Sequence, residues 1–229
     1  MTGKPILFGY PASTYTRMAL VAADEKGLDY DFQQVASWDG YEKDPKYVGK
    51  HPFLKVPVLE HEGVRLTETI AILTYFETAF DGPPLFPSDP VALAKMWEII
   101  STTINYAWPI WVPVLATNRL FNPMAGDPVD EALISSRLPE MCRAAEIIGD
   151  YLDARSGDFD LSDIVVAGAL KYATETPEWQ QISEASATLA NWWERTKNRQ
   201  TIAVHMPDTD WRQKTADYAV RHQISQPDF

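Results

Sequence analysis

The sequence contains a single cysteine, Cys142, among 229 residues. One cysteine excludes an internal disulfide, a metal site built from several cysteines, and a CxxC redox motif. Basic residues are also scarce, because 20 Lys and Arg face 32 Asp and Glu, for a net charge of −12. A chain with this charge repels a nucleic-acid backbone unless a large basic patch offsets the average, and the sequence contains no such patch. We therefore expect no nucleic-acid partner.

Long apolar runs are absent as well. The first residues, MTGKPILFGYP, lack the apolar core of about 7–15 residues that a signal peptide needs. No stretch reaches the length of about 18 apolar residues that a membrane-spanning helix requires. We therefore expect a soluble, cytoplasmic protein with no membrane partner. The apolar content of 45% is nevertheless sufficient for the core of one large domain or two smaller ones.

The first 80 residues alternate between strand-like and helix-like segments. PILFGY (5–10) predicts a short buried strand, residues 14–26 predict a helix closed by Gly27, and LDYDFQQV (28–35) predicts a second strand. A β-α-β unit of this kind requires a parallel strand pair.

A second group of elements follows. VPVLEH (56–61) and VRLTE (64–68), separated by Glu-Gly, predict a hairpin, and TETIAILTYFETAF (67–80) predicts an amphipathic helix. The order β-α-β and then β-β-α is typical of a small mixed sheet flanked by helices, as in a thioredoxin-like domain.

The segment DGPPLFPSDP (81–90) contains four prolines and excludes both a helix and a central strand. Beyond it the apolar periodicity is helical, and the expected helices span residues 91–121, 128–154, 162–173 and 182–198. We therefore expect a thioredoxin-like α/β domain over residues 1–82, a linker over 83–89, and an all-α domain over 90–229.

The segment DFDLSDIVVAGAL predicts a buried helix with an acidic capping box. The Asp160 carboxylate can accept from the N–H of Asp163, and the Asp163 carboxylate can accept from the N–H of Asp160. Because the following helix is apolar all round, we interpret both residues as structural.

Two segments could carry chemistry. YPASTYTRMALVAADEKG (10–27) places several hydroxyls at a helix start, where they either cap the helix or act on a ligand. In HPFLKVPVLEHEGVRLTET, a cis bond before Pro57 would expose the backbone of Val56 to an extended peptide. Glu68 and Thr69 begin a helix whose free N–H groups favour an anion. The alternative is an ordinary strand-edge proline and an ordinary first-turn acid.

Four motifs in this order resemble those of the cytosolic glutathione S-transferases. They are YPASTYTRMALVAADEKGLDYDF, HPFLKVPVLE, LTETIAILTYF and, in the second half, GDFDLSDIVVAGAL. The first is most similar to the phi-like, serine-type branch, in which a P-x-S-T-x-x-R run is common. The resemblance spans both predicted domains and implies the glutathione transferase fold with glutathione as co-substrate and no metal.

The resemblance implies a role for each matching residue. Ser13 donates a hydrogen bond to the glutathione thiolate, and Val56, held by a cis bond at Pro57, pairs with the cysteinyl backbone. Glu68 binds the γ-glutamyl ammonium, and Thr69 binds the γ-glutamyl carboxylate.

The glycyl carboxylate of glutathione requires cations, and Lys43 and Lys55 stand in a lysine-rich stretch of this acidic chain. Each lysine has the alternative of a solvated surface position. This sequence departs from the family pattern where His51 replaces the usual asparagine, Lys55 replaces a glutamine common in phi-like members, and Thr69 replaces serine. Glu42 lies where phi-like members often have a basic residue.

Tyrosine is the rival to serine as the catalytic hydroxyl, since tyrosine-type members carry a tyrosine at the end of the first strand. Aligned with their strand, this position falls on Gly9, and the neighbouring Tyr10 would face the opposite side of the sheet. Tyr10 and Tyr15 remain alternatives to Ser13, as does a site without a catalytic hydroxyl.

Aromatic residues define two further expectations. Phe53 lies four positions before Pro57, where dimeric members often carry an aromatic side chain that inserts into the partner, so we expect a homodimer. An apolar electrophile pocket is expected, with Pro109 and Pro113 bending the helix that supplies most of it. Its residues are Tyr15, Tyr106, Trp108, Trp111 and Phe121, unless they form simple core. The four histidines have no metal-ligand spacing.

These observations favour an enzyme that conjugates glutathione to an electrophilic apolar small molecule. Two alternatives stay open at this stage. One is a specialised glutathione-dependent isomerase, etherase or dehalogenase on the same fold, and the other is a non-catalytic binding module.

Overall fold

The computed structural model describes residues 3–35, 43–155, 157–211, 213, 214 and 217. By its internal contacts the chain falls into two compact units. Unit 1 comprises Met1–Met96, Gly157–Ile164 and Arg199–Met206, and unit 2 comprises Trp97–Ser156, Val165–Asn198 and Pro207–Phe229. The predicted division into residues 1–82 and 90–229 stays a prediction.

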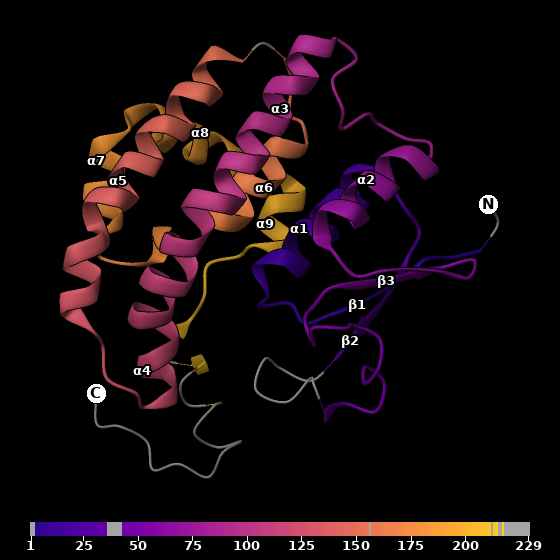
Figure 1. Cartoon of the computed structure of the whole chain (residues 1–229), viewed down its shortest axis with the longest axis horizontal. Coiled ribbons are helices and arrows are strands. Elements are labelled where there is room, and N and C mark those ends of the chain that lie inside the picture. Colours follow the sequence, from indigo (N-terminus) through magenta and orange to yellow (C-terminus); the bar gives the residue numbers. More distant parts are fainter. Residues whose placement is uncertain (1–2, 36–42, 156, 212, 215–216, 218–229) are drawn as a thin grey trace. The chain divides into compact units, whose positions relative to one another are not determined.

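Within the described residues, unit 1 contains a four-stranded mixed sheet in the order β2-β1-β3-β4 (Figure 1). The strands are β1 (Ile6–Gly9), β2 (Asp31–Gln34), β3 (Val58–His61) and β4 (Val64–Leu66). β1 runs parallel to β2 and antiparallel to β3, and β3 and β4 form an antiparallel hairpin. The predicted β-α-β unit and the predicted hairpin are therefore confirmed.

Two helices pack against each other on one side of this sheet, α1 (Thr14–Glu25) and α2 (Thr69–Ala79) (Figure 1). The α1 helix begins after Ser13, whose Oγ accepts the Thr16 N–H at 3.3 Å. It ends before Gly27, whose φ of 68° lies in the left-handed region that favours glycine. The helix predicted over residues 14–26 is confirmed.

A buried ion pair joins the ends of these helices to the proline-rich segment. Lys26 Nζ lies 3.0 Å from Glu77 Oε2, and the two side chains are only 3% and 11% exposed. The Glu77 carboxylate also accepts the N–H groups of Leu85 and Phe86, at 3.0 and 3.3 Å. Glu77 thereby holds the start of the segment that leaves the sheet domain.

A short helix from the far end of the chain, α9 (Gln200–His205), packs against α1 within unit 1. Arg199 Nε lies 2.5 Å from Glu25 Oε1, and the Thr201 hydroxyl donates to the same carboxylate. His205 Nε2 lies 2.6 Å from Asp24 Oδ2. This helix was not predicted, because six residues are too few to show a helical period.

The helix α6 (Leu161–Leu170) begins with the acidic residues that the sequence pointed to. The Asp160 N–H donates to Asp163 Oδ2 at 2.8 Å, as predicted. The Asp160 carboxylate accepts from the Ser162 N–H at 2.7 Å and from the Ser162 hydroxyl at 2.5 Å. All of these groups are buried, in agreement with their structural interpretation.

Every regular element that the structure describes in unit 2 is helical. The helix α3 (Pro90–Thr102), like α6, begins in unit 1 and ends in unit 2. The other segments are η2 (Thr103–Ala107), η3 (Ile110–Phe121), α4 (Asn122–Ala125), α5 (Glu131–Ala154), η4 (Ala173–Glu175), α7 (Trp179–Ala185) and α8 (Ala187–Thr196).

The single helix predicted over residues 182–198 is wrong. Ser186 adopts an extended conformation between α7 and α8, and its Oγ accepts the Leu189 N–H at 3.2 Å. Serine competes well for a helix start because its hydroxyl replaces a missing backbone partner. A Cβ at Gly149 of α5 would lie 2.2 Å from the Ser186 Oγ, so this break also packs closely on α5.

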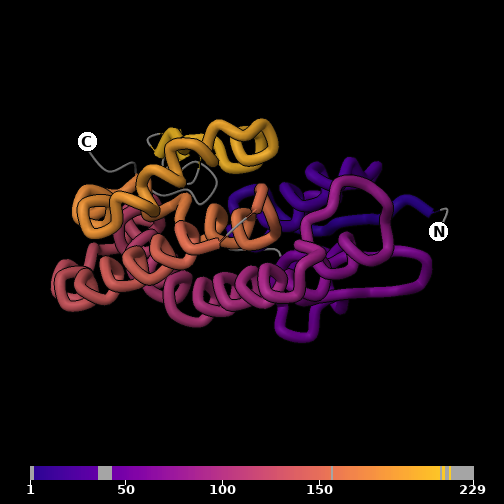
Figure 2. The backbone as a smooth tube through the Cα atoms, turned by 90° about the horizontal axis from the view of Figure 1, so that it is seen from above, coloured from indigo at the N-terminus to yellow at the C-terminus, as the bar shows by residue number. Residues whose placement is uncertain are grey.

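The predicted helix over residues 91–121 is helical throughout but irregular. The turns of η2 and η3 are π-helical, and those from η2 to α4 follow one another almost without a break (Figure 2). Pro109 occupies the N-cap position of η3, and Pro113 lies inside η3. Neither proline has the backbone N–H that a regular helical turn uses. Among the described residues no single helix has both the length and the apolar composition to cross a bilayer. One pair, Pro90–Ala107 with Ile110–Ala125, meets both criteria only across a 45° bend.

The described part of the C-terminal segment packs on unit 2. Glu175 accepts from the buried Lys171 ammonium, from the Thr209 N–H at 3.2 Å and from the Trp211 indole N–H at 2.7 Å. The Trp211 ring lies 5.5 Å from the Phe121 ring. Lys171 also holds the pKa of the Asp208 carboxyl below its ordinary value.

Candidate functional site

Ser13 lies at the start of α1, where the helix presents free N–H groups. Its side chain accepts the Thr16 N–H, and its own N–H donates to the Tyr10 carbonyl at 3.1 Å. A hydroxyl that accepts one hydrogen bond keeps its proton for another partner. The first turn of α1 contains no acidic residue that would oppose the positive end of the helix. Ser13 can therefore cap the helix and donate to an anion at the same time.

Arg17 supports the backbone on both sides of Ser13. Its Nε donates to the Pro11 carbonyl at 2.8 Å, and its N–H donates to the Ser13 carbonyl at 2.9 Å. The guanidinium-bearing side chain is buried. Arg17 is not among the predicted site residues, although its place at the end of the P-x-S-T-x-x-R run was an available signal.

Gly9, the position that corresponds to the catalytic residue of tyrosine-type members, has no room for a side chain. A Cβ there would lie 2.5 Å from Thr16 Cγ2 and 2.6 Å from Thr16 Oγ1. Thr16 is fully buried in α1, so neither atom can move aside easily. The neighbouring Tyr10 packs against the apolar cluster around Phe8.

We expect Gly9→Ala to lower the free energy of unfolding by about 1–3 kcal/mol, because it overpacks the strand–helix contact. Thr16→Ala removes the two nearest opposing atoms, Cγ2 and Oγ1. In the Thr16→Ala background, Gly9→Ala should therefore lower the free energy of unfolding by less than half as much as it does in the wild type. Urea denaturation of the two single variants and the double variant measures the coupling. An equal loss in both backgrounds would show that Thr16 is not the obstacle.

The bond between Val56 and Pro57 is cis, as the resemblance implies. β3 begins at the next residue and pairs with β1. Val56 packs with Tyr10 against the cluster around Phe8, so this loop lies beside the strand end that leads to Ser13.

The start of α2 is open. Glu68 is its N-cap residue, yet the exposed carboxylate makes no capping hydrogen bond. Thr69, the first helical residue, is 6% exposed. A carboxylate and helix N–H groups that the N-cap side chain does not cap therefore lie side by side, which suits a ligand that carries both an ammonium and a carboxylate.

The Tyr15 phenol, on the first turn of α1, interacts electrostatically with the Glu68 carboxylate at the start of α2. Burial, and secondarily the negative charge of Glu68, raise the pKa of Tyr15 to about 12. The phenol therefore stays protonated at neutral pH. Because Tyr15 is only two residues after Ser13, Glu68 also lies near the start of α1.

The start of α1, the Val56–Pro57 loop and the start of α2 thus lie at one end of the sheet. The family model for the glutathione S-transferase N-terminal domain matches residues 7–84, which hold all three segments. The chain is similar to glutathione S-transferase F6 of Arabidopsis thaliana, with 26% identity over 178 residues that cover 75% of this chain and 84% of the relative. Residues 7–84 are therefore a glutathione S-transferase N-terminal domain, and the chain is similar to glutathione S-transferases over three quarters of its length.

Solved structures agree in fold. The TM-score is 0.76 to glutathione transferase F7 from Populus trichocarpa, at 22% identity over 93% of this chain and 98% of that one. The TM-score is also 0.76 to glutathione S-transferase I from mais in complex with an atrazine glutathione conjugate, at 21% identity over 90% of this chain and 100% of that one. The chain therefore has the fold of these proteins, with a small α/β sheet domain and a helical C-terminal region, and the thioredoxin-like prediction is confirmed. The F-type plant relative fits the phi-like, serine-type resemblance.

Two lysines of this chain are available for an anion. The side chains of Lys43 and Lys55 are exposed, and neither ammonium pairs with a carboxylate of any residue that the structure describes. Lys50 differs, because it lies 2.9 Å from Glu60 Oε1 and 4.2 Å from the Phe8 ring centroid. Glu42 lies outside the described residues.

The residues predicted for the electrophile pocket divide by burial. Trp111 is fully buried, and its indole N–H donates to the Met141 carbonyl at 3.3 Å, which favours a core role. Phe121 packs edge-on against Tyr172 and Trp211. Tyr106 is 70% exposed, and Trp108 is half-buried. The pocket itself stays a prediction.

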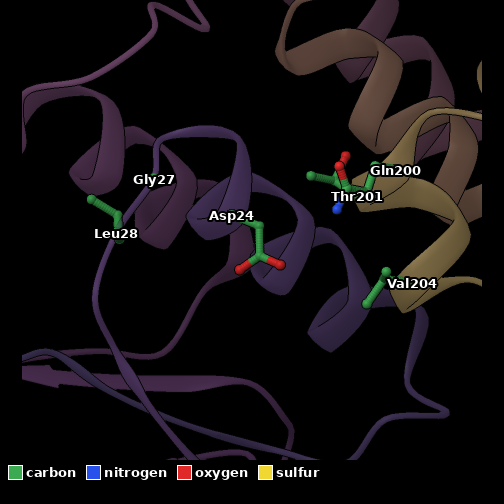
Figure 3. Close-up of a pocket in the computed structure, with 6 residues that line it drawn as sticks. All are labelled: Asp24, Gly27, Leu28, Gln200, Thr201 and Val204. Carbon is green, nitrogen blue, oxygen red and sulfur yellow. The ribbon is translucent and has the colours of Figure 1, made fainter.

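A pocket of about 410 Å³ is present elsewhere in unit 1 (Figure 3). It lies between the C-terminal end of α1 and α9, where Asp24, Leu28 and Val204 contribute side chains. Since Ser13 caps the opposite end of α1, roughly 16 Å away at 1.5 Å per residue, this pocket is separate from the candidate site. The described residues contain no group of three or more potential metal ligands.

Proposed function

We propose that this enzyme binds reduced glutathione across the starts of α1 and α2, ionises its thiol beside Ser13, and adds the thiolate to an electrophilic apolar small molecule. The observation that carries the proposal is the position of the Ser13 hydroxyl. It accepts the Thr16 N–H as the N-cap of α1 and keeps its own proton to donate, at a helix whose first turn contains no acidic residue.

The chemistry requires a stabilised thiolate. A thiol with a pKa near about 8.5 is mostly protonated at neutral pH, and lowering this pKa by about two pH units requires about 2.7 kcal/mol. A hydroxyl donor and a helix N-terminus can together supply an amount of this order. The thiol proton leaves to solvent, and the sulfur lone pair forms the new carbon–sulfur bond while the leaving group departs with its electrons.

The rest of glutathione fits the neighbouring groups. Its cysteinyl backbone pairs with Val56 before the cis Pro57, as an added strand does at a sheet edge. Its γ-glutamyl ammonium binds the exposed Glu68 carboxylate, and its γ-glutamyl carboxylate binds the hydroxyl and N–H of Thr69. Lys43 and Lys55 bind the glycyl carboxylate. The electrophile contacts the Tyr15 side chain on the first turn of α1.

Two measurements on the wild type test this function, retention on immobilised glutathione and conjugation of a generic aromatic halide. We expect both to be positive. If the protein neither binds glutathione nor conjugates the halide, the proposal fails. Retention without any conjugation would instead favour a non-catalytic glutathione-binding module.

The proposal includes a cytoplasmic homodimer. Phe53 is 74% exposed in the loop before Pro57, although exposure of an apolar phenyl ring to water is energetically unfavourable. Insertion of this ring into a second copy of the chain would remove it from solvent, in the manner of an interface anchor.

We expect Phe53→Ser to raise the dimer dissociation constant by at least about tenfold, since anchor residues contribute about 2 kcal/mol or more. Sedimentation velocity over a concentration series measures this change. Val204→Ser is the matched control, because Val204 is 61% exposed in the same unit but lies on α9. A wild-type monomer, or a Phe53→Ser protein with unchanged association, would contradict the dimer contact.

A further inference from the structure

His51 forms a bridge between two segments of the candidate site. The imidazole is 4% exposed. Its Nδ1 lies 3.0 Å from the Phe53 N–H, and its Nε2 lies 3.0 Å from the Thr67 carbonyl oxygen. The two partners belong to the loop before Pro57 and to the residues immediately before α2.

These partners determine the protonation of the ring. The Phe53 N–H can only donate, so Nδ1 must accept with its lone pair. The Thr67 carbonyl can only accept, so Nε2 must carry the proton. The bridge therefore uses one neutral tautomer, and it satisfies both nitrogens of a buried imidazole.

His51 also closes the turn over residues 51–54, in which Leu54 has an unfavourable backbone conformation. The Leu54 N–H donates to the His51 carbonyl at 3.2 Å, and Leu54 has a φ of 50°. A left-handed conformation is unfavourable for leucine and persists only where surrounding contacts impose it. The His51 side chain and carbonyl supply two such contacts, at Phe53 and Leu54, immediately before Lys55 and Val56.

We propose that His51 is a positioning residue for glutathione. It holds the Val56 backbone, which pairs with the cysteinyl unit, at a set distance from Glu68 and Thr69, which bind the γ-glutamyl unit. The inference rests on the proposed function and adds a residue that does not itself touch the ligand. An asparagine at this position offers the same pair of groups, an acceptor oxygen and an N–H donor, and is the natural substitute.

The test compares His51→Leu with His51→Asn in steady-state kinetics at saturating electrophile. For His51→Leu we expect the KM for glutathione to rise by about tenfold, equivalent to about 1.4 kcal/mol, while kcat stays within about threefold. The KM for the electrophile should not change. His51→Asn should restore the KM for glutathione to within about threefold of the wild type.

His61 provides a matched control. It is also buried in unit 1, at 3% exposure, and its two nitrogens contact the Tyr75 hydroxyl at 2.9 Å and the Gly3 carbonyl at 2.8 Å. Neither partner belongs to the candidate site. We expect His61→Leu to lower the melting temperature while leaving the KM for glutathione unchanged.

Three results would overturn the inference. They are an unchanged KM for glutathione in His51→Leu, an equal rise in His61→Leu, and a failure of His51→Asn to restore binding. If His51→Leu does not fold, the KM of His51→Asn decides, and a rise of about tenfold or more contradicts the bridge. A wild type that does not bind glutathione would instead refute the proposed function, which separates the two failures.

Discussion

Replacement of Ser13 by alanine is expected to lower kcat/KM for conjugation by about a hundredfold at neutral pH, equivalent to about 2.7 kcal/mol of lost transition-state stabilisation. The alanine cannot donate to the thiolate, and the bound thiol should lose most of its acidity. The KM for glutathione should change by less than about threefold, because Val56, Glu68 and Thr69 remain. Steady-state rates with a generic aromatic halide measure both quantities.

The pH dependence of the same variant gives a second readout. In the proposed role Ser13 stabilises the ionised thiol and so lowers its pKa, which means that its removal should raise that pKa. The rate of Ser13→Ala should therefore rise toward the wild-type value as the pH increases. Ultraviolet absorbance of the bound thiolate, recorded against pH, should show its ionisation shifted upward by about one to two pH units.

Two further variants separate catalysis from helix capping. Ser13→Thr keeps the hydroxyl and should keep most of the activity. Ser13→Gly lacks the hydroxyl but is a tolerated N-cap residue, so it should lose activity like Ser13→Ala with a smaller loss of stability. Full activity in Ser13→Ala would refute the role of Ser13 and would leave Tyr10, Tyr15 or a site without a catalytic hydroxyl as the alternatives.

Lys26→Met is expected to lower the free energy of unfolding by about 3–5 kcal/mol, because it leaves the Glu77 carboxylate buried without its countercharge. Lys26 is 4% exposed, and Glu77 also holds the N–H groups of Leu85 and Phe86, so the carboxylate cannot turn out to solvent without breaking these bonds. Urea denaturation followed by far-ultraviolet circular dichroism measures the change.

Lys4→Met is the matched control in the same unit. Lys4 lies 2.8 Å from Asp29 and 2.9 Å from Asp31, but its side chain is 42% exposed, and surface pairs of this kind contribute little to stability. We expect its denaturation midpoint to stay close to that of the wild type. Equal losses in the two variants would show that burial of the Lys26–Glu77 pair has no special effect.

Much of unit 1 could be predicted because its signals are local. Ser13 and Gly27 mark the two ends of α1, and both act through the backbone of the nearest turn. The Glu62-Gly63 pair between two apolar runs predicted the hairpin, and Gly63 has a φ of 83°. The start of α6 followed from acidic residues three positions apart, since a capping box needs only neighbouring groups.

Other features could not be predicted, because their partners are distant in sequence. Ser186 interrupts the predicted helix over residues 182–198, and it packs on Gly149 of α5. Arg199 pairs with Glu25, 174 positions earlier, and so holds α9 in unit 1. Local periodicity contains no information on such contacts, which form only when the chain is folded.

The sequence by itself determined the order of the sheet elements along the chain and the helix starts at Ser13 and Glu68, since these depend on backbone geometry within a few residues. Its motifs also carried the resemblance to the glutathione S-transferases. The tertiary structure decided which side chains remain available there. It pairs Lys50 with Glu60, leaves Lys43 and Lys55 exposed, and buries Trp111 among the helices. It also shows that His51, which stands where the family usually has asparagine, is hydrogen-bonded to the Thr67 carbonyl. A hydrogen bond over sixteen positions forms only where the folded sheet brings two loops together.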